Sequence, residues 1–126
     1  MVMTVGDLSR TLDGELICCP EASDRPVPTF AASDLLSDIL ALEKENYALI
    51  TGLTNAQIVR TADITNSCCI VIVRNKKPQQ AAVALAQNMG IPIILSPCTM
   101  FDACARLSRC SARENDDPTA GTADTT

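Results

Sequence analysis

"CCIVIVRNKKPQQAAVALAQNMGIPIILS", residues 68–96, contains a strand, a helix and a second strand in succession. Residues 68–75 form an uninterrupted run rich in β-branched side chains, which is typical of a strand covered on both faces. Residues 76–90 predict a helix, with Pro78 near its first position and Gly90 just past its end. Residues 91–96 predict the next strand. A strand, helix and strand in this order favour parallel pairing with a right-handed crossover.

The same alternation extends in both directions from this segment. The other elements are expected at 4–12 (helix), 15–20 (strand), 33–40 (helix), 47–53 (strand), 54–65 (helix) and from 99 onward (helix). Ser33 is expected to cap the helix 33–40, with Asp34 in its first turn. We therefore predict an α/β fold, a three-layer α/β/α sandwich around a mostly parallel sheet of about four to five strands.

The chain is expected to hold one domain, residues 1–110, followed by a tail. Residues 111–126 are small, polar and acidic without an apolar period, which predicts a disordered segment. No stretch resembles a signal peptide, and none approaches the roughly 20 apolar residues of a membrane span. A cytoplasmic location is therefore expected.

Composition argues against several classes of partner and reaction. The net charge of −5 disfavours nucleic acid and anionic lipid, and aromatic residues are only 2% of the 126 residues, which leaves few platforms for stacking bases. The sequence has no histidine, no G-x-S-x-G motif and no P-loop. A small phosphotransfer or hydrolytic enzyme is disfavoured, and we predict a protein that is not an enzyme.

Seven cysteines are the most conspicuous chemical feature. Cys18-Cys19 and Cys68-Cys69 are adjacent pairs on predicted strands, so their side chains are expected on opposite faces of the sheet. The other three, at 98, 104 and 110, are six residues apart and do not share a helix face. We predict reduced, mostly buried thiols and neither a metal nor a cofactor. The alternative is a redox or iron–sulfur accessory protein that combines distant cysteines.

A first group of candidate binding residues surrounds the start of the helix 33–40. Asp24 and Arg25 precede two prolines, and Thr29, Ser33 and Asp34 follow. Such a helix terminus can receive an anion, with Arg25 as a bidentate clamp for a phosphate or carboxylate. It can equally be a structural corner in which Arg25 ties the loop to a nearby aspartate or to a neighbouring subunit.

Asp34 also forms a second pattern, because Asp38 lies one helical turn further on. Two carboxylates on one helix face could hold Mg²⁺ or act as acid and base. They could also simply be a solvated face.

A second group of candidates follows the strand 47–53. Thr51, Gly52, Thr54 and Asn55 lie where that strand passes into the next helix, and open α/β sheets usually bind ligands at the carboxyl ends of their strands. These residues could line a small pocket together with the first group. They could also be ordinary turn and capping residues.

The order of segments "TVGDL", "DGELICCPE", "DRPV", "ASDLLSDIL", "ALITGLTNAQIVRTADI", "CCIVIV" and "GIPIILSPCTMFDACARL" resembles the DRTGG domain over roughly residues 3–109. That family occurs alone, often beside iron-only hydrogenase genes, or between regulatory modules. The resemblance implies an α/β/α sandwich similar to the N-terminal domain of HPr kinase/phosphorylase, self-association, and a regulatory or ligand-sensing role.

One departure from the family concerns the turn before Ser33. Relatives usually carry glycines there, whereas this chain has Pro28, Thr29 and Phe30. Glycine lets backbone amides approach an anion closely, so without it either Thr29 supplies a hydroxyl instead or the anion site is absent. The change therefore weakens the case for phosphate binding at that corner.

The leading hypothesis is thus a regulatory or ligand-sensing DRTGG domain linked to iron-only hydrogenase function. The expected partners are a small anionic or nucleotide ligand, another protein, and a second copy of the chain. The second copy would pack on the apolar face of the helix 33–40.

Overall fold

The computed structural model describes residues 3–114 and contains a five-stranded sheet in the order β1-β5-β4-β3-β2. The strands are β1 (Glu15–Cys18), β2 (Thr29–Ala32), β3 (Tyr47–Thr51), β4 (Cys69–Ile72) and β5 (Ile93–Leu95). β2, β3, β4 and β5 are mutually parallel, and β1 runs antiparallel to β5 at the other edge. The predicted fold class, a mostly parallel sheet within three layers, is confirmed.

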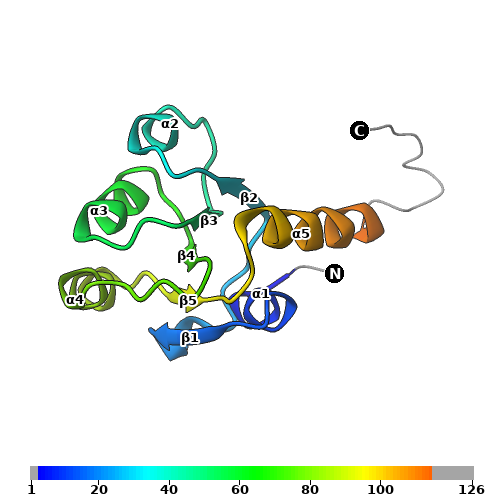
Figure 1. The fold of residues 1–126 in the computed structure, drawn as a ribbon, viewed down its shortest axis with the longest axis horizontal. Helices are drawn as coiled ribbons and strands as arrows, with labels where there is room; N and C mark the ends of the chain where they lie inside the picture. The colour runs from blue at the N-terminus through cyan, green and yellow to red at the C-terminus, as the bar shows by residue number, and fades with distance from the viewer. Residues whose placement is uncertain (1–2, 115–126) are drawn as a thin grey trace.

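Helices cover both faces of the sheet, as Figure 1 shows. α1 (Val5–Thr11) and α5 (Met100–Glu114) lie on one side, and α2 (Leu36–Leu40), α3 (Ala56–Ile64) and α4 (Gln80–Met89) lie on the other. A short 3₁₀ turn, Pro20–Ala22, follows β1. Within the described residues, every helix is too short or too polar to cross a bilayer.

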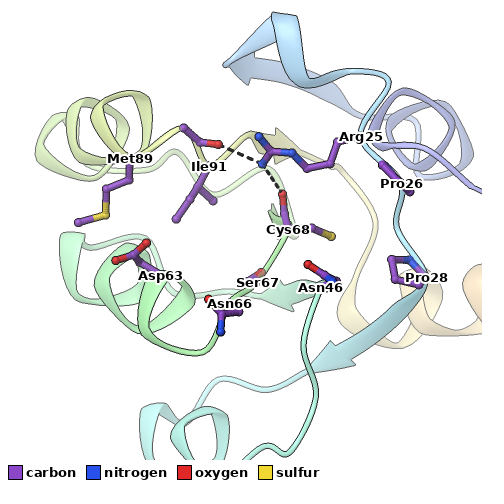
Figure 2. A pocket seen from close by; sticks show the side chains of 11 residues that line it. Arg25, Pro26, Pro28, Asn46, Asp63, Asn66, Ser67, Cys68, Met89 and Ile91 are labelled. Atoms are coloured by element: carbon purple, nitrogen blue, oxygen red, sulfur yellow. Dashed lines mark hydrogen bonds between the residues drawn. The ribbon is translucent and has the colours of Figure 1, made fainter.

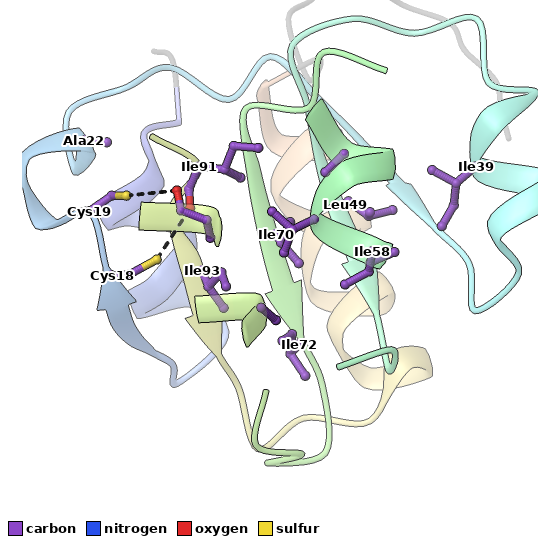
Figure 3. Packing of buried hydrophobic residues seen from close by; sticks show 14 of the residues in the cluster. Cys18, Cys19, Ala22, Ile39, Leu49, Ile58, Ile70, Ile72, Ile91 and Ile93 are labelled. Carbon is purple, nitrogen blue, oxygen red and sulfur yellow. Dashed lines mark hydrogen bonds between the residues drawn. The ribbon is translucent and has the colours of Figure 1, made fainter. Parts of the chain in front are cut away.

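Each face of the sheet has its own core, and the alternation of side chains along β3 and β4 supplies both. Leu49 and Ile70 pack with α2, α3 and α4, where Ile39, Ile58 and Ala86 are fully buried (Figure 3). Ile50 and Val71 pack on the opposite face with α1 and α5, where the buried residues include Leu8, Leu12, Ala103 and Leu107. The covered strand predicted within residues 68–75 is confirmed for β4, which is buried throughout, whereas Arg74 and Asn75 lie past its end and are exposed.

The segment between Pro28 and Leu36 differs from the prediction. Thr29–Ala32, expected as a turn, is the edge strand β2, which pairs with β3 from Thr29↔Tyr47 to Ala32↔Ile50. The N-cap of α2 is Leu35, two residues later than the predicted Ser33, and it has no side-chain cap. The predicted Ser33 cap is wrong, because Ser33 Oγ accepts a 3.0 Å hydrogen bond from the Leu35 amide and closes a local turn. Asp34 consequently lies before the helix rather than in its first turn.

Residues 111–114, predicted as the start of a disordered tail, are helical. α5 continues as a helix to Glu114, four residues past the expected end of the domain. The rest of the predicted tail, 115–126, lies outside the described residues.

Candidate functional site

The predicted binding residues lie at two opposite ends of the sheet. Asp24 and Arg25 precede β2, whereas Ser33 and Asp34 follow it. β2 is four residues long, which separates the two groups by about 13 Å along the strand. Thr29, at the first position of β2, is half-buried at the same end as Arg25. The single corner proposed from the sequence is therefore two separate places in the structure.

Asp34 joins the second predicted group at the carboxyl end of the parallel strands. Its Oδ1 accepts a 2.6 Å hydrogen bond from the Gly52 amide and a 3.3 Å bond from Thr51 Oγ1. A Cβ on Gly52 would lie 3.2 Å from Arg74 Nη2 and 3.3 Å from Asp34 Oδ1, so only glycine fits without displacement. The Asp34 carboxylate thus already accepts the hydrogen bond from the Gly52 amide that a bound anion would need. Its role here is structural, because it links the end of β2 to the end of β3.

Thr54 and Asn55 have structural roles at the same end. The Asn55 side chain accepts a 3.2 Å hydrogen bond from the Ile58 amide and caps α3, as one alternative from the sequence expected. The Thr54 carbonyl accepts a 2.9 Å bond from the Gln79 amide at the start of α4. Asp38 lies exposed on α2, and Asp34 lies outside that helix, so the two are not a pair on one helix face. Among the described residues, no three acidic, cysteine or histidine side chains gather closely enough to hold a metal ion.

A cavity of about 410 Å³ lies at the opposite, amino end of the parallel strands. Its walls come from residues that directly precede strands and from the last turns of α3 and α4. They are Arg25, Pro26, Pro28, Asn46, Asp63, Asn66, Ser67, Cys68, Met89, Gly90 and Ile91. Figure 2 shows Arg25 on one side of this cavity and Asp63 and Asn66 on another. Its volume lies in the range of small-molecule sites. Hereafter we call it the Arg25 cavity.

Arg25 is the cation of this cavity, and its side chain also forms hydrogen bonds that hold the loop in place. Its Nη1 donates to the Cys68 carbonyl at 3.1 Å and to the Gly90 carbonyl at 3.0 Å. The loop is thus tied to the start of β4 and the end of α4, not to an aspartate. The ion pairs of the described residues are Arg10–Asp7, Arg106–Asp13 and Arg106–Asp102, and Arg25 is not among them. Its charge therefore faces the cavity without an anionic partner in this part of the chain.

Two asparagines contribute neutral polar groups to the cavity. Asn46 and Asn66 have left-handed backbones, with φ of 56° and 59°, and the Asn46 amide donates to the Asn66 carbonyl at 2.8 Å. Asparagine tolerates this conformation better than other side chains, so these residues form tight corners with amides at the cavity rim. Sequence reasoning missed both. An asparagine just after a helix is a recognised stop signal, and that signal was available for Asn66.

The cysteines are arranged differently from the prediction, although all seven are free and five are buried. Cys18 and Cys19 belong to the same core cluster, with their thiols directed to the Ile91 and Ala86 carbonyls (Figure 3). Cys68 and Cys69 share the cluster on the other face. The opposite-face expectation fails because Cys19 has left the strand with φ of 57°, and Cys68 precedes the first residue of β4.

The Cys68–Cys69 pair has an unusual electrostatic setting. A hydrogen bond from the Cys69 thiol lowers the pKa of the Cys68 thiol, and the nearby Arg25 charge lowers it further against the opposing effect of burial. The same hydrogen bond and complete burial raise the pKa of Cys69. Burial likewise raises the pKa of Cys18 to about 11. Cys68, at the wall of the Arg25 cavity, is therefore the thiol whose ionised form the structure favours.

The fold and the two ends of the sheet define a three-layer α/β domain with an arginine-lined cavity. Its sequence matches the DRTGG domain family over residues 7–110, and the chain belongs to that family. The resemblance inferred from the sequence is thus confirmed.

A solved structure is similar in fold. It is the crystal structure of the CBS and DRTGG domains of the regulatory region of Clostridium perfringens pyrophosphatase, complexed with its activator diadenosine tetraphosphate. The similarity has a TM-score of 0.65 at 18% sequence identity and covers 79% of this chain and 44% of that one. This chain therefore spans less than half the length of that regulatory region, and the likeness at this identity concerns the fold.

Proposed function

We propose that this protein is a regulatory DRTGG domain that binds a small anionic or nucleotide ligand in the Arg25 cavity and catalyses no reaction. The observation that carries this proposal is the guanidinium of Arg25, which lines a cavity of about 410 Å³ and pairs with no carboxylate among the described residues. A half-buried, uncompensated cation is a favourable partner for a phosphate or carboxylate.

The rest of the cavity suits a ligand with a polar body attached to its anionic group. Asn46 and Asn66 offer amides that can both donate and accept, and Met89 and Ile91 offer apolar surface. A nucleotide combines these features, and the similar Clostridium perfringens regulatory region is itself complexed with a dinucleotide. Because Nη1 of Arg25 is occupied by two carbonyls, a ligand would use Nε or Nη2.

A thermal-shift screen followed by isothermal titration calorimetry tests this proposal. The probes are AMP, ADP, ATP, diadenosine tetraphosphate, acetyl phosphate and inorganic phosphate, each with and without Mg²⁺. We expect one of these compounds to raise Tm and to bind with an affinity that falls as salt is added, since an ion pair in a half-exposed site is screened. A flat screen with every probe would overturn the proposal.

Two variants with opposite expected effects on ligand affinity separate a loss of binding from a general loss of stability. Arg25→Lys keeps the positive charge but loses the planar fork, so affinity for the bound probe should fall about tenfold or more. Asp63→Asn removes the exposed carboxylate that faces the same cavity, so affinity for an anion should rise. Arg60→Ala, an exposed arginine of α3 outside the cavity lining, is the matched control and should leave affinity unchanged.

We further propose that the domain acts as a homodimer and serves iron-only hydrogenase function, as the family resemblance implies. The dimer is supported by exposed apolar side chains, since Phe101, Ile64, Leu35 and Leu40 are each more than half exposed. Sedimentation velocity at micromolar concentration tests the dimer. Hydrogenase activity per unit of hydrogenase in cells depleted of this protein tests the second part, and unchanged activity would overturn it.

The Cys68–Cys69 pair favours a second candidate function, a thiol-based redox accessory protein. The lowered pKa of the Cys68 thiol, beside Cys69 and Arg25, favours its reactive thiolate form, although the residue is only 5% exposed. Mass spectrometry after mild peroxide treatment would show oxidation at Cys68 before any other cysteine. A brown, anaerobically purified protein would instead support an iron–sulfur role.

A further inference from the structure

The side of α5 next to β2 carries a groove and an unpartnered aromatic ring. The groove holds about 230 Å³ and is lined by Phe30, Ala31, Ala32, Ile50, Cys104, Leu107 and Ser108. Phe101, one turn before Cys104 on the same helix, is 85% exposed. Phe101, Cys104 and Ser108 follow each other at helical spacing and form one stripe, which we call the α5 stripe.

We propose that two copies of this chain pair through their α5 stripes, with the helices antiparallel and each Phe101 ring seated in the groove of the other copy. This inference rests on the proposed homodimer. It assigns the interface to α5 and β2 instead of the α2 face expected from the sequence. The occupant of the groove is thus a second copy of the same chain.

The spacing of the stripe makes it complementary to itself. In an antiparallel pair of helices related by a two-fold axis near Cys104 and Ala105, Phe101 of one copy lies opposite Ser108 of the other. The two positions are seven residues apart, or about 10.5 Å along the helix. The same contact is then made twice, as a two-fold interface requires. The small side chains of Cys104 and Ala105 allow the helices to approach closely at the centre.

The groove has the size and chemistry for a phenyl ring. An apolar cavity of about 150 Å³ is sufficient to hold benzene, and this groove holds about 230 Å³. None of its seven lining residues carries a charge, although the chain has a net charge of −5. The Phe101 ring can therefore enter the groove without burying a charged side chain of the groove lining.

Direct strand addition at the adjacent sheet edge is a weaker explanation of self-association. Lys44 Nζ donates a 2.6 Å hydrogen bond to the Phe30 carbonyl on the outer edge of β2, and Pro28 precedes the strand. Lysine and proline at an edge strand are typical protections against pairing with another chain. The α5 stripe, by contrast, has no such protection.

Sedimentation equilibrium of four proteins tests the assignment. Phe101→Ala removes two rings from each dimer and should raise the dimer Kd at least about a hundredfold. Ile64→Ala removes an exposed apolar residue, 70% exposed, from α3 on the opposite layer and should change Kd less than about twofold. Leu40→Ala tests the α2 face in the same way. Unchanged urea midpoints would show that each variant is folded.

The outcomes separate this inference from the proposed homodimer. A wild-type dimer that is lost in Leu40→Ala, or retained in all variants, overturns the α5 assignment and leaves the homodimer standing. A chain that stays monomeric at all concentrations overturns both. Loss of the dimer in Phe101→Ala alone supports the assignment.

The position of Cys104 near the axis gives an independent readout. Diamide should convert two Cys104 thiols, one from each copy, into a disulfide, and the two hydrogens pass to the diazene of the reagent. The resulting covalent dimer should be absent in Cys104→Ser and present in Cys110→Ser. A wild-type dimer that forms no Cys104 cross-link would overturn the antiparallel register.

Discussion

Replacing Arg25 by alanine should lower the free energy of unfolding by about 2 kcal/mol, because hydrogen bonds to charged groups contribute about 1.5–3 kcal/mol each. The structure shows two such bonds, from Nη1 to the carbonyls of Cys68 and Gly90. Their full sum would overstate the loss. Arg25 is only half-buried and lines an open cavity, so in the variant water can donate hydrogen bonds to the two carbonyls in place of the guanidinium.

The assay is urea unfolding followed by far-ultraviolet circular dichroism, since the chain has no tryptophan and one tyrosine. A loss of about 2 kcal/mol should lower the urea midpoint by about 1 M and Tm by roughly 6–10 °C. Arg25→Lys should lie between wild type and alanine, because lysine keeps the charge but cannot reach both carbonyls with one planar group.

The control is Arg60→Ala, at an exposed arginine of α3, which should stay within about 0.5 kcal/mol of wild type. An Arg25→Ala protein within that same range would refute the reasoning. It would mean that the two carbonyls are satisfied equally well by water and that Arg25 does not hold the loop to α4.

Three further predictions concern local features of the backbone and its charges. Gly90→Ala should destabilise the protein by about 1 kcal/mol, because Gly90 has φ of +72° with open space around it, so the cost is conformational and the urea midpoint reports it. Asn55→Ala should cost about 1 kcal/mol by removing the cap of α3, whereas Asn55→Asp should retain stability. The pKa of Asp7 is lowered chiefly by the Thr4 amide, so its contribution to stability is present above the ordinary carboxyl pKa and lost as pH falls through the lowered value. Asp7→Asn should therefore be less stable than wild type at pH 7, and pH-dependent urea unfolding should show the two proteins converging towards pH 2.

The alternation of strands and helices could be predicted because each predicted element from 47 to 96 carries its own local signal. Continuous apolar runs mark β3, β4 and β5, and Pro78 and Gly90 bracket α4. β2 has no such signal. It is four residues long, follows two prolines, and forms because β3 offers a parallel edge at Tyr47–Ile50. A strand that forms mainly because it pairs with a distant segment has only a weak signal in its own sequence.

The candidate site was harder to predict than the fold for the same reason. Residues 24–34 are close in sequence, which predicts one corner, but β2 lies between their two halves and places them at opposite ends of the sheet. The cavity at the amino end is formed by residues such as Asn46, Asn66 and Gly90, which come together only through the parallel register of β3, β4 and β5. These residues share only a position just before a strand or just after a helix. Such positions do not recur at a regular interval along the sequence.

The position of Arg25 also links the proposed ligand to the packing of α4. The α4 helix ends at the cavity with the partial negative charge of its last carbonyls, and Arg25 already donates to one of them, at Gly90. An anion at the free nitrogens of the same guanidinium restrains that side chain further, so it also restrains the contact between the 23–28 loop and the end of α4. Amide exchange at residues 89–91 should therefore slow when the ligand binds. Under the proposed function, this coupling would let the domain report occupancy, because the residue proposed to bind the anion also links two segments 65 residues apart.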